Sequence, residues 1–410
     1  MFEPLKMCAL LSVFVFPCFG VSPELSLEER VGQLLMAHFH GEVANEEAKA
    51  LIQDTKIGNI IYYNWSNGLT SPEQIQRLSS GLQALAGQTP AKIPLLIATD
   101  QEGGLVSRCE KGFTIFPGNK ALGETGDADL AEEAAFVMGQ ELKAVGINMN
   151  LAPVIDVNIN PQNPVIGSRS FGDQPEMVAA FGERALQGYK KAGVIATLKH
   201  FPGHGDVSVD SHYDLPVVNK SLEELQKVEL MPFAKLQCVA DAIMTAHIMS
   251  PLDRDHCATL SLKTLSYLRD QMGFQGVIVS DSLVMQGVLN QCQVADSDYV
   301  LSVADAAIRA LQSGHDLLIL GGKQLIGAHA NLELTVADIQ RIHATIVQAV
   351  TSGRITEDRI NQAVARVLKL KEKAIVSNVP SLSSINTKAS QALAQKISTL
   401  ALKSIDKKSI

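Results

Sequence analysis

The residues best suited to chemistry lie in one glycine-rich stretch near the middle of the chain. Residues 199–206 read KHFPGHGD, and Asp210 and His212 follow a few positions later. The glycines and the proline disfavour a helix, so we expect a loop. Asp210 and His212 stand two positions apart, which lets the carboxylate reach the imidazole in a turning chain. Such a carboxylate fixes the ring tautomer and favours its protonated form, as a general acid that later acts as a base requires.

Two other interpretations of this stretch compete with an acid/base role. Its histidines and aspartates, His200, His204 and Asp206 among them, could bind a metal, but their spacing fits neither HExxH nor a zinc-finger pattern. We therefore expect no metal and no other cofactor. The stretch could also be a surface loop that is polar for solubility alone. The residue types by themselves leave that second interpretation open.

A second candidate is Asp281, which directly follows the apolar run 277–280. A carboxylate at the end of a buried strand is well placed to act as a nucleophile. The alternative is a helix N-cap, because Asp and the adjacent Ser282 are both good capping residues. The residues favour neither interpretation over the other.

Two more stretches place charged residues beside glycines. Asp100 opens the segment DQEGG and Arg108 follows it, so the pair could accept hydrogen bonds from a polar ligand and donate to it. Arg169 lies beside an aromatic residue in the glycine-bounded segment 167–172. A structural ion pair or a surface turn is the simpler interpretation of each stretch taken alone.

The polar residues fall at the ends of expected strands, because short apolar runs alternate with helical patterns along the chain. Asp100, Lys199, His200 and Asp281 each end such a run. Near-continuous apolar strands that alternate with helices indicate a parallel sheet, and about eight strands indicate a (β/α)8 TIM-type barrel. An open doubly wound sheet is less well supported, because no GxGxxG motif follows a strand. We expect strands at 37–40, 58–63, 94–99, 147–151, 194–199, 241–246, 276–280 and 316–320 and helices at 127–145, 175–192, 221–236, 261–272, 303–312 and 355–374, with two more starting near residues 26 and 71.

The domain organisation is expected to be simple. Residues 21–376 form one catalytic barrel domain, and residues 377–410 form a linker and a helical tail that could be the remnant of a second domain. Residues 1–20 resemble a signal peptide, since positions 7–16 are almost wholly apolar. We therefore expect export to the periplasm or the medium, with a cytoplasmic location as the alternative.

Composition excludes several classes of partner. The net charge of -8, without a basic stripe, argues against nucleic-acid binding. No apolar run is long enough to span a bilayer as part of the mature chain. The cysteines form no CxxC motif, so they indicate neither a zinc nor a redox site. We expect a monomer.

Taken together, the motifs resemble glycoside hydrolase family 3, and within it the bacterial β-N-acetylglucosaminidases. The resemblance runs from Leu27 to Lys373, and the run KHFPGHG…DSH is its most specific part. That run separates this branch from the β-glucosidases of the family, whose acid/base lies in a second domain. The sequence departs from the family pattern at Ser282, where Asp is usual, and at Leu105, where Arg is usual. Neither departure replaces a residue assigned to the chemistry.

The resemblance implies a function and a set of roles. It implies a retaining exo-β-N-acetylhexosaminidase that releases terminal N-acetylglucosamine from a small carbohydrate or muropeptide, most naturally a peptidoglycan fragment. Two alternatives are a phosphorylase, in which phosphate replaces water, and a sugar-binding protein that has lost catalysis. The implied roles are nucleophile for Asp281, acid/base for His212 with help from Asp210, and sugar binding for Asp100, Arg108, Arg169, Lys199 and His200.

Overall fold

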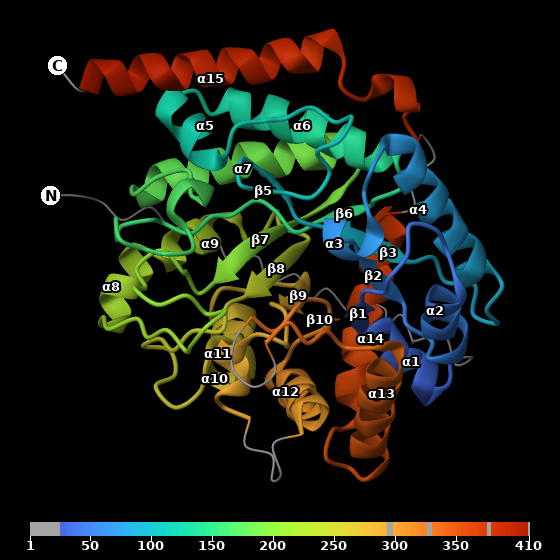
Figure 1. Cartoon of the computed structure of the whole chain (residues 1–410). Helices are drawn as coiled ribbons and strands as arrows, with labels where there is room; N and C mark the ends of the chain where they lie inside the picture. Colours follow the sequence, from blue (N-terminus) through green and yellow to red (C-terminus); the bar gives the residue numbers. More distant parts are fainter. Residues whose placement is uncertain (1–24, 293–297, 326–329, 375–378, 409–410) are drawn as a thin grey trace, which may run out of the picture.

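The fold is a closed parallel barrel. The computed structural model describes residues 25–292, 298–325, 330–374 and 379–408, so the signal peptide predicted at 1–20 lies outside the described residues. Within them, eight parallel strands form one sheet in the order β10-β1-β2-β3-β6-β7-β8-β9, and helices surround it (Figure 1). A parallel bridge between Val279 and Leu317 joins the two edges of the sheet. The prediction of a (β/α)8 barrel is therefore confirmed.

The barrel strands are short and buried on both faces, as expected for a parallel sheet. In β9, Val277 and Val279 belong to one hydrophobic cluster, whereas Ile278 between them belongs to another. A short antiparallel hairpin, β4 (Gln101–Gly103) with β5 (Val106–Ser107), follows β3 outside the barrel. The barrel strands are β1 (Leu35–Ala37), β2 (Asn59–Ile61), β3 (Leu96–Thr99), β6 (Met149–Asn150), β7 (Ile195–Phe201), β8 (Ala242–Thr245), β9 (Val277–Ser280) and β10 (Leu318–Ile319).

The helices begin and end at residues that the sequence marks. Ser26 and Glu29 form a capping box at the start of α1, and Ser71 caps α4 with Pro72 as its first residue. Gly193, at a φ of 74°, ends α7. The α-helices are α1 (Leu27–Gln33), α2 (Glu46–Lys49), α3 (Asn64–Asn67), α4 (Pro72–Gly87), α5 (Asn119–Thr125), α6 (Asp129–Ala144), α7 (Pro175–Ala192), α8 (Leu222–Lys227), α9 (Leu230–Leu236), α10 (Leu262–Ser266), α11 (Gln286–Leu289), α12 (Tyr299–Ser313), α13 (Val336–Thr351), α14 (Glu357–Ala374) and α15 (Lys388–Lys408).

Two elements differ from the sequence expectation for identifiable reasons. The first strand ends at Ala37, because the Phe39 carbonyl accepts a hydrogen bond from the Asn67 side chain (3.1 Å) instead of joining the sheet. The helix expected over 221–236 is split into α8 and α9. Pro232 has no N–H to donate to the carbonyl of Val228, so one continuous helix would lose that bond.

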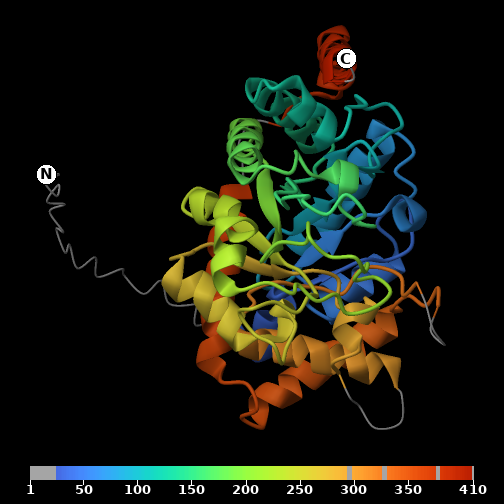
Figure 2. The ribbon, with the colours of Figure 1, turned by 90° about the vertical axis from the view of Figure 1, so that its left-hand side faces the viewer.

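The helical tail packs on the outside of the barrel. Helix α15 lies along α5 and α6, and a view turned by 90° shows it nearly end-on at the edge of the molecule (Figures 1 and 2). Its Ala394 and Ile397 are buried, and the Asn386 N–H before it donates to Glu141 (2.9 Å). The proposal that this tail is a remnant of a second domain stays a prediction. No helix of the described residues has the length and apolar character needed to cross a membrane.

Candidate active site

A pocket of about 390 Å³ opens where the barrel strands end. This volume lies within the range of small-molecule sites, and its position is where barrels of this type place their chemistry. Asp210 does not line the pocket but contacts His212, which does. The other predicted site residues all line it: Asp100, Arg108, Arg169, Lys199, His200, His212 and Asp281.

Asp281 follows β9 and faces the pocket as a carboxylate. The N-cap interpretation is wrong, because the next helix, α11, starts at Gln286 and has Met285 as its N-cap. Burial by itself would raise the pKa of Asp281, but nearby imidazoles, that of His247 foremost, and the Ser282 N–H (2.7 Å) hold it below its usual value. Asp281 is thus ionised at neutral pH, as a nucleophile must be.

His212 and Asp210 form the close pair that their spacing predicts. The Nδ1 of His212 lies 2.8 Å from Oδ1 of Asp210, and the backbone N–H of His212 donates to the same oxygen at 2.9 Å. Burial opposes the charged imidazole, but the hydrogen bond and the charges of Asp210 and Asp281 outweigh it, so the pKa of His212 is raised. Nε2 makes no hydrogen bond within the described residues, and the side chain is 39% exposed. The ring can therefore exchange a proton with a ligand and with solvent.

A second imidazole–carboxylate pair lies deeper in the pocket. Nδ1 of His200 lies 2.7 Å from Asp156, and Nε2 lies 3.4 Å from the guanidinium of Arg169. Both ring nitrogens of His200 therefore face other groups of the protein, whereas, among the residues that the structure describes, only Nδ1 of His212 does. His200 is thus arranged to bind and orient a ligand. His212 is the better placed of the two for proton transfer.

Glu102 is a central residue of the site that the sequence did not single out. It is buried, accepts two hydrogen bonds from Arg169 (2.9 and 2.8 Å), and lies 2.6 Å from Nζ of Lys199. Burial would raise the pKa of Glu102, but the charges of Arg169 and Lys199 keep it far below its usual value. Lys199 also reaches Asp100 at 3.0 Å. Glu102 therefore fixes the two cations that face the pocket.

Aromatic side chains form one wall near the pocket mouth. The rings of Tyr63 and Trp65 are stacked, with centroids 4.9 Å apart, and the guanidinium of Arg108 lies 5.8 Å from the Tyr63 centroid. Nε of Arg108 is buried and has no hydrogen-bond partner in the described part of the chain. An apolar face beside a free donor suits a sugar, which has apolar ring faces and hydroxyl edges.

Two further histidines support the catalytic loops. His204 hydrogen-bonds Ser211, next to His212 (3.1 Å), and burial lowers its pKa to about 4. His247 follows β8 and hydrogen-bonds both Thr259 and the carbonyl of Ser282 (2.8 Å each). The sequence did offer one signal for His247, which directly follows the expected strand at 241–246. Glu102 lies within the segment DQEGG but had no role assigned to it, and no motif contained Tyr63 or Trp65.

The fold and the pocket define the class to which the protein belongs. A (β/α)8 barrel with a carboxylate and an imidazole–carboxylate pair facing a sugar-sized pocket is the architecture of a glycoside hydrolase. Residues 26–370 match the glycosyl hydrolase family 3 N terminal domain. The chain belongs to that family.

Individual proteins agree with this placement. The chain is similar to "Beta-hexosaminidase A" of Pseudoalteromonas piscicida (36% identity, 80% of this chain, 55% of the relative) and "Beta-hexosaminidase" of Pseudomonas aeruginosa strain LESB58 (34%, 76% and 87%). The match thus spans just over half the length of the Pseudoalteromonas protein. A solved family 3 β-N-acetylglucosaminidase from Paenibacillus sp. str. FPU-7 superimposes with a TM-score of 0.81 at 40% identity, covering 92% of this chain and 69% of its own.

Proposed function

We propose that the chain is a retaining exo-β-N-acetylhexosaminidase that hydrolyses terminal β-linked N-acetylglucosamine. The observation that carries the proposal is that ionised Asp281 and His212, which is paired with Asp210, line the same pocket. Relatives named β-hexosaminidase and a β-N-acetylglucosaminidase structure support the choice of sugar. A protein that only binds sugar would have no need for this combination.

In the first step, the carboxylate of Asp281 attacks the anomeric carbon and forms a glycosyl ester. The bond to the leaving-group oxygen breaks as the imidazolium of His212 donates its Nε2 proton to that oxygen. Asp210 stabilises the imidazolium through Nδ1. Asp100, Arg108, Lys199 and the Arg169–His200 pair hold the hydroxyls and amide of the sugar.

In the second step, water opens the ester. Neutral His212 takes a proton from the water as its oxygen bonds to the anomeric carbon, and Asp281 leaves as a carboxylate. Two inversions at the same carbon give net retention of configuration. Histidine thus fills the role that a second carboxylate has in most retaining glycosidases.

The natural substrate in this proposal is a peptidoglycan fragment in which N-acetylglucosamine is β-linked to a muramic-type sugar. This part rests on the likeness of the KHFPGHG…DSH run to the bacterial branch of the family. Export through residues 1–20 and a monomeric state also stay predictions.

A phosphorylase is the second candidate. After the first step His212 is neutral, so it would not repel an anionic acceptor as a carboxylate would. Gly322 and Lys323, from the loop after β10, line the pocket, and this loop is where many barrels bind phosphate. Phosphate would then open the ester in place of water and yield a sugar 1-phosphate.

One experiment tests the sugar and the acceptor together. We expect nitrophenyl β-N-acetylglucosaminide to be turned over about 100-fold or more faster than the β-glucoside, because a site built to bind the amide leaves polar groups unpaired without it. The panel is run with and without inorganic phosphate, and products are separated by mass. Equal or faster turnover of the glucoside would contradict the proposal, and sugar 1-phosphate as the main product would establish the phosphorylase.

The pH profile tests the role of Asp210. The rate constant kcat/KM falls in acid as Asp281 is protonated and falls in alkali as His212 loses its proton. Because Asp210 raises the pKa of His212, Asp210→Asn should lower that pKa and move the alkaline limb to lower pH, while the acid limb stays. Asp255→Asn, at an exposed aspartate, is the control and should move neither limb. An unmoved alkaline limb in Asp210→Asn would assign that limb to another group.

A further inference from the structure

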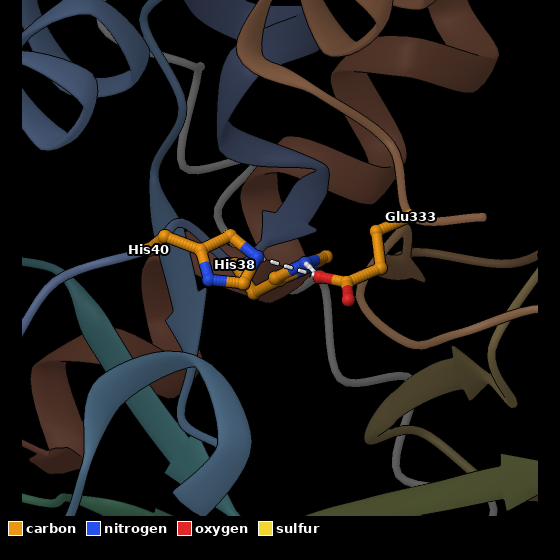
Figure 3. A group of neighbouring side chains, drawn as sticks. All are labelled: His38, His40 and Glu333. Carbon is orange, nitrogen blue, oxygen red and sulfur yellow. Dashed lines mark hydrogen bonds and ion pairs between the residues drawn. The ribbon is translucent and has the colours of Figure 1, made fainter. Parts of the chain in front are cut away.

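A second cluster of ligating side chains lies beside the pocket. His38 and His40 follow β1, and Glu333 precedes α13, so the cluster joins the loops after the first and the last strand of the barrel. Figure 3 shows both imidazoles turned toward one carboxylate. None of the three residues lines the pocket, and the mechanism above uses none of them. In the described residues, this is the only group of His, Cys, Asp and Glu side chains close enough to share a metal ion.

The geometry suits a tetrahedral ion. Oε2 of Glu333 lies 3.3 Å from Nε2 of His38 and 2.7 Å from Nε2 of His40, and the three ligand atoms lie within 4.8 Å of one another. Ligands about 2.0–2.1 Å from a tetrahedral zinc ion stand about 3.3 Å apart, so binding needs only a small outward movement. Two imidazoles and one carboxylate, with an open fourth position, form a donor set that zinc accepts.

The cluster is held in place without an ion. The backbone of His40 is fixed from both sides, since its N–H donates to Glu47 (3.0 Å) and its carbonyl accepts from Asn45 (2.7 Å). Nζ of Lys323 lies 2.7 Å from the other carboxylate oxygen of Glu333, Oε1. Oε2 therefore remains available to the two imidazoles. The ligand atoms therefore converge before any metal arrives, which reduces the ordering cost of binding.

The electrostatics also permit a cation. His38 is buried, and its Nε2 lies 3.3 Å from the carboxylate oxygen Oε2 of Glu333, so an ion bound there would lie beside a negative charge. Glu333 supplies the negative charge of the cluster, and its carboxylate contacts Lys323 and both histidines. A divalent ion would take the place of the protons that now lie between the imidazoles and the carboxylate. The positive charge of Lys323 would repel the ion, but its ammonium group contacts Oε1 of Glu333, which is not the oxygen that would bind the ion.

We propose that His38, His40 and Glu333 form a zinc site, separate from the catalytic residues, that cross-links the loops after β1 and β10. This proposal departs from the expectation of no metal and does not depend on the proposed function. The site adjoins the pocket through Trp65, whose ring centroid lies 5.0 Å from that of His38 and 4.3 Å from Nζ of Lys323. A bound ion would thus stabilise one wall of the pocket without touching the reacting atoms.

The test is direct binding of zinc to the full chain after treatment with a chelator. We expect one zinc ion per chain by calorimetry, and a melting temperature about 3 °C higher at a zinc concentration about 100 times the dissociation constant. Cobalt(II), used as a coloured substitute, should give the visible absorption of a tetrahedral site. Absence of zinc binding would overturn the proposal.

Variants locate the site. His40→Ala and Glu333→Gln should each weaken zinc binding by more than the roughly 10- to 100-fold that loss of an outer-shell partner costs. His40 is half exposed, so its replacement should not affect folding, which circular dichroism and melting without metal would check. His256→Ala removes an exposed histidine elsewhere, and His212→Ala removes one from the pocket, and both should bind zinc as the wild type does. Unchanged affinity in His40→Ala and Glu333→Gln, or its loss in His212→Ala, would place the zinc elsewhere and refute the proposed site.

Discussion

Replacement of Asp281 by alanine should leave a folded protein with almost no activity. A retaining mechanism has no bypass for its nucleophile, so we expect kcat to fall on the order of 10^5-fold or more on an N-acetylglucosaminide. The fold should survive, because the carboxylate caps no helix and its one backbone contact is to the adjacent Ser282. Kinetics and thermal melting on the same preparation measure both effects.

The matched control is an aspartate that does cap a helix. Asp298 accepts a hydrogen bond from the Leu301 N–H at the start of α12 (3.1 Å) and lies outside the pocket. Asp298→Ala should lower the melting temperature slightly and leave kcat unchanged. If Asp281→Ala behaved in the same way, keeping its rate and losing only stability, Asp281 would not be the nucleophile.

A helix or strand can be located from the sequence when the residues that define its ends lie within it or directly beside it. The strand 276–280 and the helix 175–192 were found almost to the residue, because apolar runs, Pro175 and Gly193 are local features. The break between α8 and α9 was not foreseen, although Pro232 is visible in the sequence. A proline can kink a helix or end it, and only the packing of the flanking segments decides which.

The same distinction applies to the active site, where contacts between close neighbours in the sequence were predictable and contacts between distant residues were not. The Asp210–His212 contact follows from a spacing of two residues, so it was predictable from the sequence. Glu102 was overlooked because its partners, Arg169 and Lys199, are 67 and 97 positions away and meet it only in the closed barrel. The partners of Asp156 and Glu333 are distant in the same way. A strand-end position shows that a polar residue faces the barrel mouth but does not show which residue it will meet.

Replacement of His212 by alanine should affect the two chemical steps unequally. An aryl leaving group needs little protonation, so formation of the glycosyl ester should remain fairly fast in His212→Ala. Hydrolysis of the ester still needs a base, so that step should slow by about 10²- to 10⁴-fold. The covalent adduct on Asp281 should then accumulate, with an initial burst of nitrophenol and a mass increase of one sugar residue on the protein.

A small anionic nucleophile should restore turnover to this variant. Azide needs no deprotonation, so it can open the ester without a base, and the exposed side of the His212 pocket leaves room for it. The product should be the β-glycosyl azide, because two inversions at the anomeric carbon give retention. Wild-type enzyme should gain little from azide, since water is already activated there.

The control and the contradicting outcomes follow from the geometry. His256→Ala, at an exposed histidine paired with Asp253, should show neither a burst nor azide rescue. Normal rates of His212→Ala on natural substrates with poor leaving groups would mean that another group donates the proton. An α-configured azide would indicate a single displacement, and Asp281 would then act as a general base rather than as the nucleophile. Retention together with an adduct confined to the His212 variant can arise only if the imidazole acts after the sugar is already bound to Asp281.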